Sequence, residues 1–276
     1  MNLNNTDLKY SIDDETLEIL CAIDRVTDSQ YFVIGASARD MIFYNIYGLE
    51  LSERATGDID FAVCVQNWQD YDEIRSQLKK THNFKDDESQ RQRLIAPSGV
   101  PIDFIPFGSI SEDDRSIQWP DTDLTMSIMG FKDAQKTCYT INFQNYSINI
   151  ISIELFTVLK FVAWADRNDR IKDLKDIKYI IEQYIKIPQV RLQVKEFELT
   201  KVLSDLNHIS AAILAINIKN KVSAETHCVL YDIISSGTDH SSANPLTKKF
   251  KKVTHGSYNT AQGLLSVFQK YLGMSS

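Results

Sequence analysis

The hydrophobic periodicity of the chain changes once, near residue 150, and this change limits the folds that the sequence can adopt. Before it, short apolar runs alternate with segments of helical spacing. After it, from Ser152 to Leu272, apolar residues recur mostly three and four positions apart, which indicates helices. The sequence therefore predicts an α+β domain over residues 1–150 and a helical domain over residues 151–276.

Several elements can be placed from local signals. An acidic first turn and apolar residues at helical spacing predict a helix from Asp13 to Thr27. The run "YFVIG" predicts a strand that stops at Gly35, followed by a helix. Turn residues at Pro97–Gly99 and near Asn145 each separate two strand-like runs, so we expect two strand pairs there. The polar interval Ser235–Asn259 is predicted to be a long loop.

Composition excludes some classes of protein. The net charge of −7 argues against non-specific coating of nucleic acid, which needs a dense field of Lys and Arg. The four cysteines are far apart and lack metal-site spacing, which favours free thiols in a reducing compartment. No apolar run approaches the ~20 residues of a membrane span, and the N-terminus lacks signal-peptide character. We therefore expect a cytoplasmic protein without membrane contact.

The stretch "RATGDIDFAV" places two aspartates where a strand begins. Residues two apart on a strand point to the same face, so Asp58 and Asp60 should project together. Two neighbouring carboxylates in a half-buried site are costly unless a cation joins them. Mg²⁺ takes carboxylate oxygens and completes its shell with water and substrate phosphates. By itself, D-x-D is a weak signal, because surface strands also carry it.

Two further features strengthen the case for a metal–nucleotide site. Asp103 lies inside the apolar run "VPIDFIPFG", where a lone carboxylate is expensive unless it is paired or metal-bound. In "VIGASARD" a strand ends at Gly35 and a helix begins with small residues, which lets a phosphate approach free backbone N–H groups. If the strands of Asp60 and Asp103 are neighbours, three carboxylates converge.

In this order, Gly35-Ala36-Ser37, Asp58-Ile59-Asp60 and Asp103 resemble the DNA polymerase β-type nucleotidyltransferase superfamily. Within it, "ERATGDIDFAV" and "SIELFTVLKFVAWADRNDRIKDLKDI" resemble the AbiEii-type nucleotidyltransferases, toxin components of bacterial toxin–antitoxin systems. The similarity extends from about Tyr31 to Tyr184. It implies a mixed sheet with flanking helices, followed by a helical region that completes the nucleotide and acceptor site.

The resemblance also implies roles for individual residues. Asp58, Asp60 and Asp103 would be the catalytic, metal-binding carboxylates for Mg²⁺ or Mn²⁺. Asp58 and Asp60 would hold one ion on the phosphates of an NTP, and Asp60 and Asp103, with Asp58 bridging, a second ion. The predicted nucleotide-binding residues are Gly35, Ala36, Ser37, Arg39, Arg54, Thr56, Lys160, Asp173 and Asp176.

The expected reaction is transfer of NMP from an NTP, such as ATP, to an acceptor hydroxyl with release of pyrophosphate. The acceptor would be RNA (tRNA) or protein, and a cognate antitoxin would be a partner. Two alternatives stay open: an enzyme that modifies a small aminoglycoside-like molecule, and a non-catalytic nucleotide-binding module. The lysines of "KKFKKVTH" form a basic patch that is either a solvated loop or a contact for RNA or another polyanion.

Overall fold

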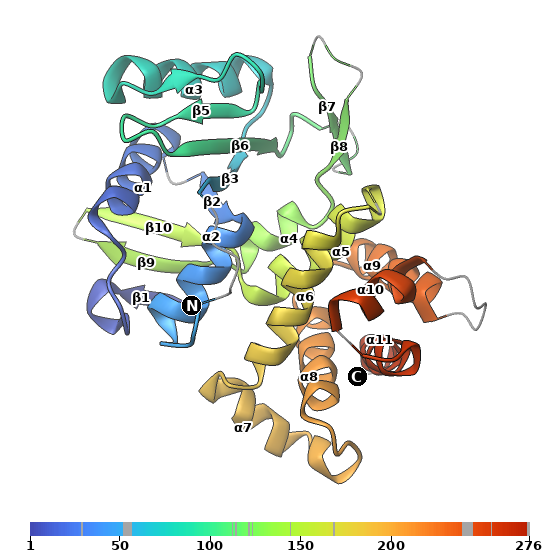
Figure 1. Cartoon of the computed structure of the whole chain (residues 1–276). Coiled ribbons are helices and arrows are strands. Elements are labelled where there is room, and N and C mark those ends of the chain that lie inside the picture. The colour runs from blue at the N-terminus through green and yellow to red at the C-terminus, as the bar shows by residue number, and fades with distance from the viewer. Residues whose placement is uncertain are drawn as a thin grey trace. The chain divides into compact units, whose positions relative to one another are not determined.

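The computed structural model describes two compact units, Met1–Phe156 and Thr157–Ser276. The residues described are 1–28, 30–51, 57–111, 113, 115–120, 122, 124–143, 145–167, 169–238, 245–254 and 256–274. The first unit combines strands and helices, and the second is built from helices (Figure 1). The predicted fold class, an α+β region followed by a helical region, is therefore confirmed.

A mixed sheet of eight strands forms the centre of the first unit, in the order β1-β9-β10-β2-β3-β6-β5-β4. Parallel pairs (β1/β9, β10/β2 and β3/β6) alternate with antiparallel ones over most of the sheet. A separate ribbon is formed by β7 and β8. The strand bounds are β1 Asn2–Asn4, β2 Tyr31–Ile34, β3 Ile59–Cys64, β4 Lys85–Asp86, β5 Arg93–Ile95, β6 Pro101–Phe107, β7 Ser116–Gln118, β8 Thr125–Ser127, β9 Tyr139–Phe143 and β10 Tyr146–Ile150.

The first two α-helices of the first unit begin where the sequence predicts, at Asp14 and at Gly35. The Asp13 side chain caps α1 (Asp14–Thr27) by accepting a hydrogen bond from the Thr16 backbone N–H. The Asn67 side chain caps α3 (Trp68–His82) in the same way. Helix α1 packs against both β10 and α3. The remaining helical segments are η1 Asn5–Asp7, α2 Gly35–Asp40, the π-helix η2 Met41–Ile46 and α4 Phe131–Lys136.

Both predicted strand pairs are present. Strands β5 and β6 form an antiparallel hairpin whose turn is closed by Ala96 and Val100, and Gly99 within it has φ +94°. The left-handed backbone at Gly99 suits a residue without Cβ. Strands β9 and β10 form the second antiparallel pair, with Asn145 between them.

In the second unit, α8 (Leu206–Lys219) is buried on most of its surface and packs against α6, α7 and α11. A helix that is apolar on all sides belongs at the centre of a bundle. The other bounds are α5 Ile153–Asp166, which spans the boundary between the units, α6 Ile171–Tyr184, α7 Pro188–Glu196, η3 Leu199–Lys201, α9 Ala224–Thr238, α10 Pro245–Thr254 and α11 Tyr258–Gly273.

The prediction of a long loop over Ser235–Asn259 is wrong. Helix α9 continues to Thr238, α10 spans Pro245–Thr254, and α11 starts at Tyr258. Leu246, Phe250 and Val253 of α10 are buried, and their spacing of four and three places them on one helical face. The polar composition of the interval concealed this amphipathic pattern, since Lys248, Lys251 and Lys252 lie exposed on the opposite face of α10.

Across the described part of the chain, no helix has both the length and the apolar character needed to span a membrane.

Candidate active site

Three carboxylates meet where β3 and β6 lie side by side in the sheet. The parallel register places Asp60 directly opposite Asp103, and Asp58 precedes the first residue of β3. One oxygen from each of Asp58, Asp60 and Asp103 lies within 4.8 Å of the others, and all three residues are half-buried. The strands are held in place by buried apolar residues that flank each aspartate, such as Phe61 and Phe104, whose rings stack.

The donor set fits a divalent cation. Carboxylate oxygens are the ligands that Mg²⁺ and Mn²⁺ prefer, and three of them at this separation repel one another without a positive charge. In this structure Arg93 supplies positive charge: its Nε and Nη2 donate to Asp103 Oδ1 and Oδ2 at 2.7 and 2.8 Å. Its Nη2 also lies 3.4 Å from Asp58 Oδ2. The hydrogen bonds and charge of Asp103 raise the pKa of Arg93, so the guanidinium stays charged.

Arg93 is not among the site residues predicted from the sequence, although the hairpin contains the signal. The turn pairs Ala96 with Val100, and continuing that register places Arg93 opposite Asp103. A hairpin centred on Ser98 therefore predicts this neighbour. The basic residues of "RQRLIA" give no reason on their own to choose Arg93.

Gly35 lies against the carboxylate of Asp60. Its φ is +67°, and a Cβ built on it would be 1.8 Å from Asp60 Oδ2. Only glycine fits both this backbone conformation and this approach. The hydroxyl of Ser37 donates to the backbone carbonyl of Asp58 at 2.8 Å, which ties the start of α2 to the segment before β3. The structure therefore brings the predicted Gly35 turn next to the carboxylates.

Other predicted residues of the first unit lie differently. The Ala36 side chain is buried within α2. The Arg39 side chain is 0% exposed and pairs with Asp40 at 2.8 Å. This geometry favours a structural role for Arg39 over the predicted contact with a triphosphate. Arg54 and Thr56 lie outside the described residues.

Lys160, Asp173 and Asp176 come together in the second unit. The Lys160 Nζ lies 3.2 Å from Asp173 Oδ1 and 2.7 Å from Asp176 Oδ2, and Arg170 Nε lies 3.0 Å from Asp173 Oδ2. The helical stretch is divided here, since α5 ends at Asp166 and α6 begins at Ile171. Asp173 and Asp176, three positions apart on α6, therefore share a face. Their role in nucleotide binding stays a prediction.

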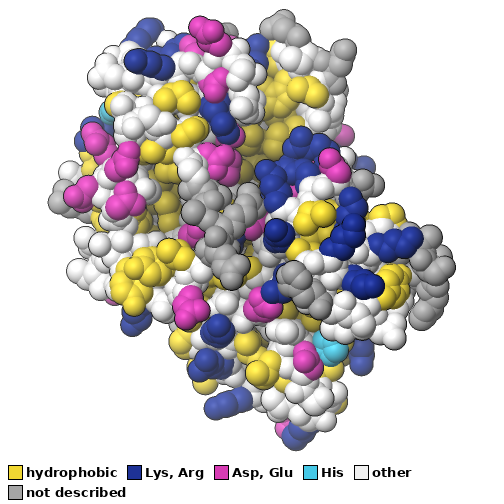
Figure 2. All heavy atoms as spheres, in the orientation of Figure 1, with side chains coloured by type: hydrophobic (Ala, Val, Ile, Leu, Met, Phe, Trp, Pro, Cys, Tyr) yellow, Lys and Arg dark blue, Asp and Glu magenta, His cyan; other side chains and the backbone are white. Residues whose placement is uncertain are grey.

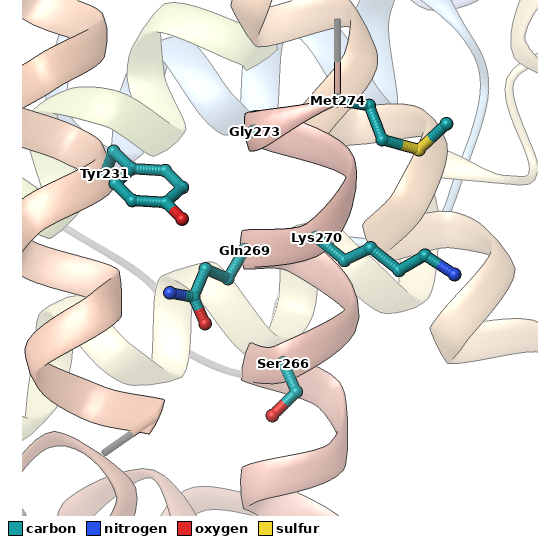
Figure 3. A pocket seen from close by; sticks show the side chains of 6 residues that line it. All are labelled: Tyr231, Ser266, Gln269, Lys270, Gly273 and Met274. Atoms are coloured by element: carbon teal, nitrogen blue, oxygen red, sulfur yellow. The ribbon is translucent and has the colours of Figure 1, made fainter.

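A pocket in the second unit has a different character. Figure 3 shows it between α9 and α11, lined by Tyr231, Ser266, Gln269, Lys270, Gly273 and Met274. The Gln269 side-chain amide donates to Ser235 Oγ at 2.8 Å. The lining offers one ammonium group and no carboxylate, so this pocket lacks the groups needed for metal-dependent transfer.

Comparison with known families identifies the class of protein. The profile of the family described as "Nucleotidyl transferase AbiEii toxin, Type IV TA system" matches residues 41–213, more than half of the chain. The chain belongs to the AbiEii nucleotidyltransferase family. The matched range contains all three carboxylates and the Lys160 cluster, and it begins after the Gly35 turn. The AbiEii match supports nucleotidyltransferase activity in this chain.

Two further comparisons add little. The cyclic dinucleotide synthase CdnE of Elizabethkingia meningoseptica, solved with GTP and Apcpp, is 13% identical over 98% of this chain and 94% of its own, with a TM-score of 0.28. Comparison with curated proteins gives no match.

Proposed function

We propose that this AbiEii-family enzyme transfers NMP from an NTP to a hydroxyl of RNA, with Mg²⁺ or Mn²⁺ held by Asp58, Asp60 and Asp103. The observation that carries the proposal is the convergence of these three carboxylates within 4.8 Å beside the Gly35 turn. A site of this kind needs oxygen ligands for a hard cation and a backbone that a phosphate can approach. The first unit would be the catalytic domain.

In the reaction, the acceptor oxygen bonds to the α-phosphorus of the NTP, the bond from that phosphorus to the bridging oxygen breaks, and pyrophosphate leaves. Bound metal would neutralise charge on the triphosphate and favour ionisation of the acceptor hydroxyl. Asp58 and Asp60 would hold the nucleotide-side ion, and Asp103 with Asp60 the acceptor-side ion. Ser37 would keep the Gly35 turn fixed against the segment of Asp58.

Lysine side chains of α10 support RNA as the acceptor. Lys248, Lys251 and Lys252 are exposed on the face opposite the buried residues of the helix, and Lys249 is half-buried at the edge of that face. None of the four forms an ion pair with a described residue. Figure 2 shows Lys and Arg side chains over the part of the second unit where α10 lies. Several lysines on one face attract a phosphate backbone through sequence-independent electrostatics. The apolar face of α10 is already buried, which disfavours insertion into a lipid surface.

Labelled NTPs test the reaction and the acceptor together. Purified protein is incubated with each α-labelled NTP, Mg²⁺ and either total RNA or total protein, and label is followed into each polymer. We expect label in RNA, lost with EDTA and lost in Asp58→Asn. The control Asp232→Asn removes an exposed carboxylate of α9 and should leave transfer unchanged. Label in protein instead would show that the acceptor is protein and not RNA, while the proposed NMP transfer would still hold.

Charge reversal tests the α10 surface. In Lys248→Glu/Lys251→Glu/Lys252→Glu, we expect weaker RNA binding and a smaller dependence of binding on salt, since each lost phosphate contact lowers the slope by about one. The matched control reverses three exposed lysines elsewhere, Lys80, Lys186 and Lys195. Equal loss in both triple variants would show that net charge, and not α10, sets the affinity.

We further propose that the enzyme acts as a toxin held in check by a cognate antitoxin, as the family description implies. Induced expression should arrest growth, and Asp60→Asn should not. Raised resistance to an aminoglycoside without growth arrest would favour the small-molecule alternative.

A further inference from the structure

Arg93 engages the oxygens that a metal ion would need. Its Nε and Nη2 donate to the two different oxygens of Asp103, an arrangement of two parallel, charge-assisted hydrogen bonds. The same Nη2 reaches toward Asp58 Oδ2 at the longer distance of 3.4 Å. One end of the guanidinium thus lies between two of the three carboxylates.

The backbone of Arg93 is fixed while its side chain keeps access to solvent. Its carbonyl accepts hydrogen bonds from the Asp87 N–H and from the Arg75 guanidinium, and its own N–H donates to Gln90. The Arg93 side chain is 19% exposed. In the sheet, only the two-residue strand β4 lies between β5 and the edge. The long Arg93 side chain can therefore leave the carboxylates without disturbing β5.

The negative charge of the three carboxylates favours a cation at the position of Arg93. Carboxylates this close destabilise one another when all are ionised, and a neighbouring positive charge removes part of that cost. A divalent ion does the same with twice the charge. Two cations that need the same oxygens cannot both hold them at full strength, because they also repel each other at this range.

We propose that Arg93 is the internal counter-ion of the carboxylate site and competes with the divalent cation for Asp103 and Asp58. In the metal-free protein Arg93 holds the two strands' carboxylates together, and metal loading displaces its side chain. The inference rests on the proposed metal site. It makes Arg93 a residue that sets metal affinity and metal-free stability.

Metal binding and unfolding, measured without substrate, test this. Mn²⁺ affinity is determined by electron paramagnetic resonance of free Mn²⁺, and thermal unfolding is followed in EDTA and in excess Mn²⁺. For Arg93→Gln we expect about tenfold tighter Mn²⁺ binding, equal to about 1.4 kcal/mol, and a lower Tm in EDTA that excess Mn²⁺ restores. Arg93→Lys, which keeps a charge but loses the paired geometry, should fall between wild type and Arg93→Gln.

Arg91→Gln is the matched control. Arg91 is two residues away, lies over the Trp68 ring and pairs with Asp72 at 3.8 Å, so its loss should not change Mn²⁺ affinity. Unchanged or weaker Mn²⁺ binding in Arg93→Gln would overturn the competition. Asp60→Asn separates this from failure of the metal site: if it binds Mn²⁺ as well as wild type, the proposed site itself is wrong. If it loses binding while Arg93→Gln equals wild type, only the role of Arg93 is wrong.

Discussion

The two units each contain a cluster of acids and bases, and the clusters differ in burial and in how their charges are matched. In the second unit the side chains of Asp173 and Asp176 are 0% and 2% exposed. Asp173 pairs with Lys160 and Arg170, and Asp176 pairs with Lys160. In the first unit three carboxylates gather near Arg93, and Asp58 is 38% exposed. Buried, matched charges suit a structural cluster, whereas partly exposed carboxylates leave room for a cation and substrate.

This comparison yields separate expectations for activity and for stability. Substitution in the first cluster should reduce transfer and leave the fold intact. Substitution in the second should first destabilise the fold, because loss of one partner leaves a buried charge without compensation.

The largest effect is expected for Asp60→Asn. Removal of one ligand charge should lower transfer at least about 10³-fold, since a metal contributes several kcal/mol to stabilisation of the transition state. The melting temperature in EDTA should not fall, because one of three mutually repelling charges is removed. Single-turnover transfer and thermal unfolding measure the two quantities. An active Asp60→Asn enzyme would contradict the mechanism.

Asp173→Ala should have the largest effect on stability. Lys160 and Arg170 would lose a fully buried partner, and the free energy of unfolding should fall by about 3–5 kcal/mol. Urea unfolding measures this loss. The control Asp169→Ala removes an exposed carboxylate near the start of α6 and should change stability by less than about 0.5 kcal/mol. A similar small change in both variants would show that the second cluster is not structural.

Metal addition should stabilise the first cluster alone. At a Mg²⁺ concentration 100 times its Kd, the folded protein gains about 2.7 kcal/mol. Hydrogen exchange resolves where the gain lies: amides of β3 and β6 should become more protected, and those of α6 should not. Equal protection of both regions would mean that the ion binds elsewhere or that the units unfold together.

Gly35→Ala should destabilise the fold less than Asp173→Ala does. The left-handed backbone costs a residue with Cβ about 1–3 kcal/mol, and the added atom would displace the Asp60 carboxylate. We therefore expect reduced Mn²⁺ affinity together with this modest loss of stability. In the second unit, Gly263→Ala meets only ordinary contacts with His208 in the middle of α11, and should raise stability by up to about 1 kcal/mol. Loss of Mn²⁺ affinity in Gly263→Ala as well would refute this local explanation.

Local patterns predicted much of the fold. Asp13 gives the start of α1, and the turn at Gly99 gives the β5/β6 hairpin, because capping and turn chemistry depend on neighbouring residues. The loop expected over Ser235–Asn259 is wrong because the many polar residues of this interval conceal the helical spacing of Leu246 and Phe250.

The candidate site was predicted in part. Its carboxylates follow from motifs, but the pairing of Asp60 with Asp103 depends on which strands are neighbours, and that is a property of the whole sheet. The burial of Arg39 and the enclosure of Lys160 by Asp173 and Asp176 also depend on tertiary packing. The family motifs indicated these residues but not what surrounds them.

The parallel pairing of β3 with β6 has a consequence for how the enzyme folds. Asp60 and Asp103 belong to strands separated by α3 and the β5 hairpin strand, so their contact closes a long loop, and such contacts form slowly. During synthesis, the three carboxylates cannot meet until the chain through Phe107 has left the ribosome. If these carboxylates hold the proposed metal, affinity for Mn²⁺ should report completion of the central sheet, and a nascent chain whose sheet is incomplete should not bind the ion.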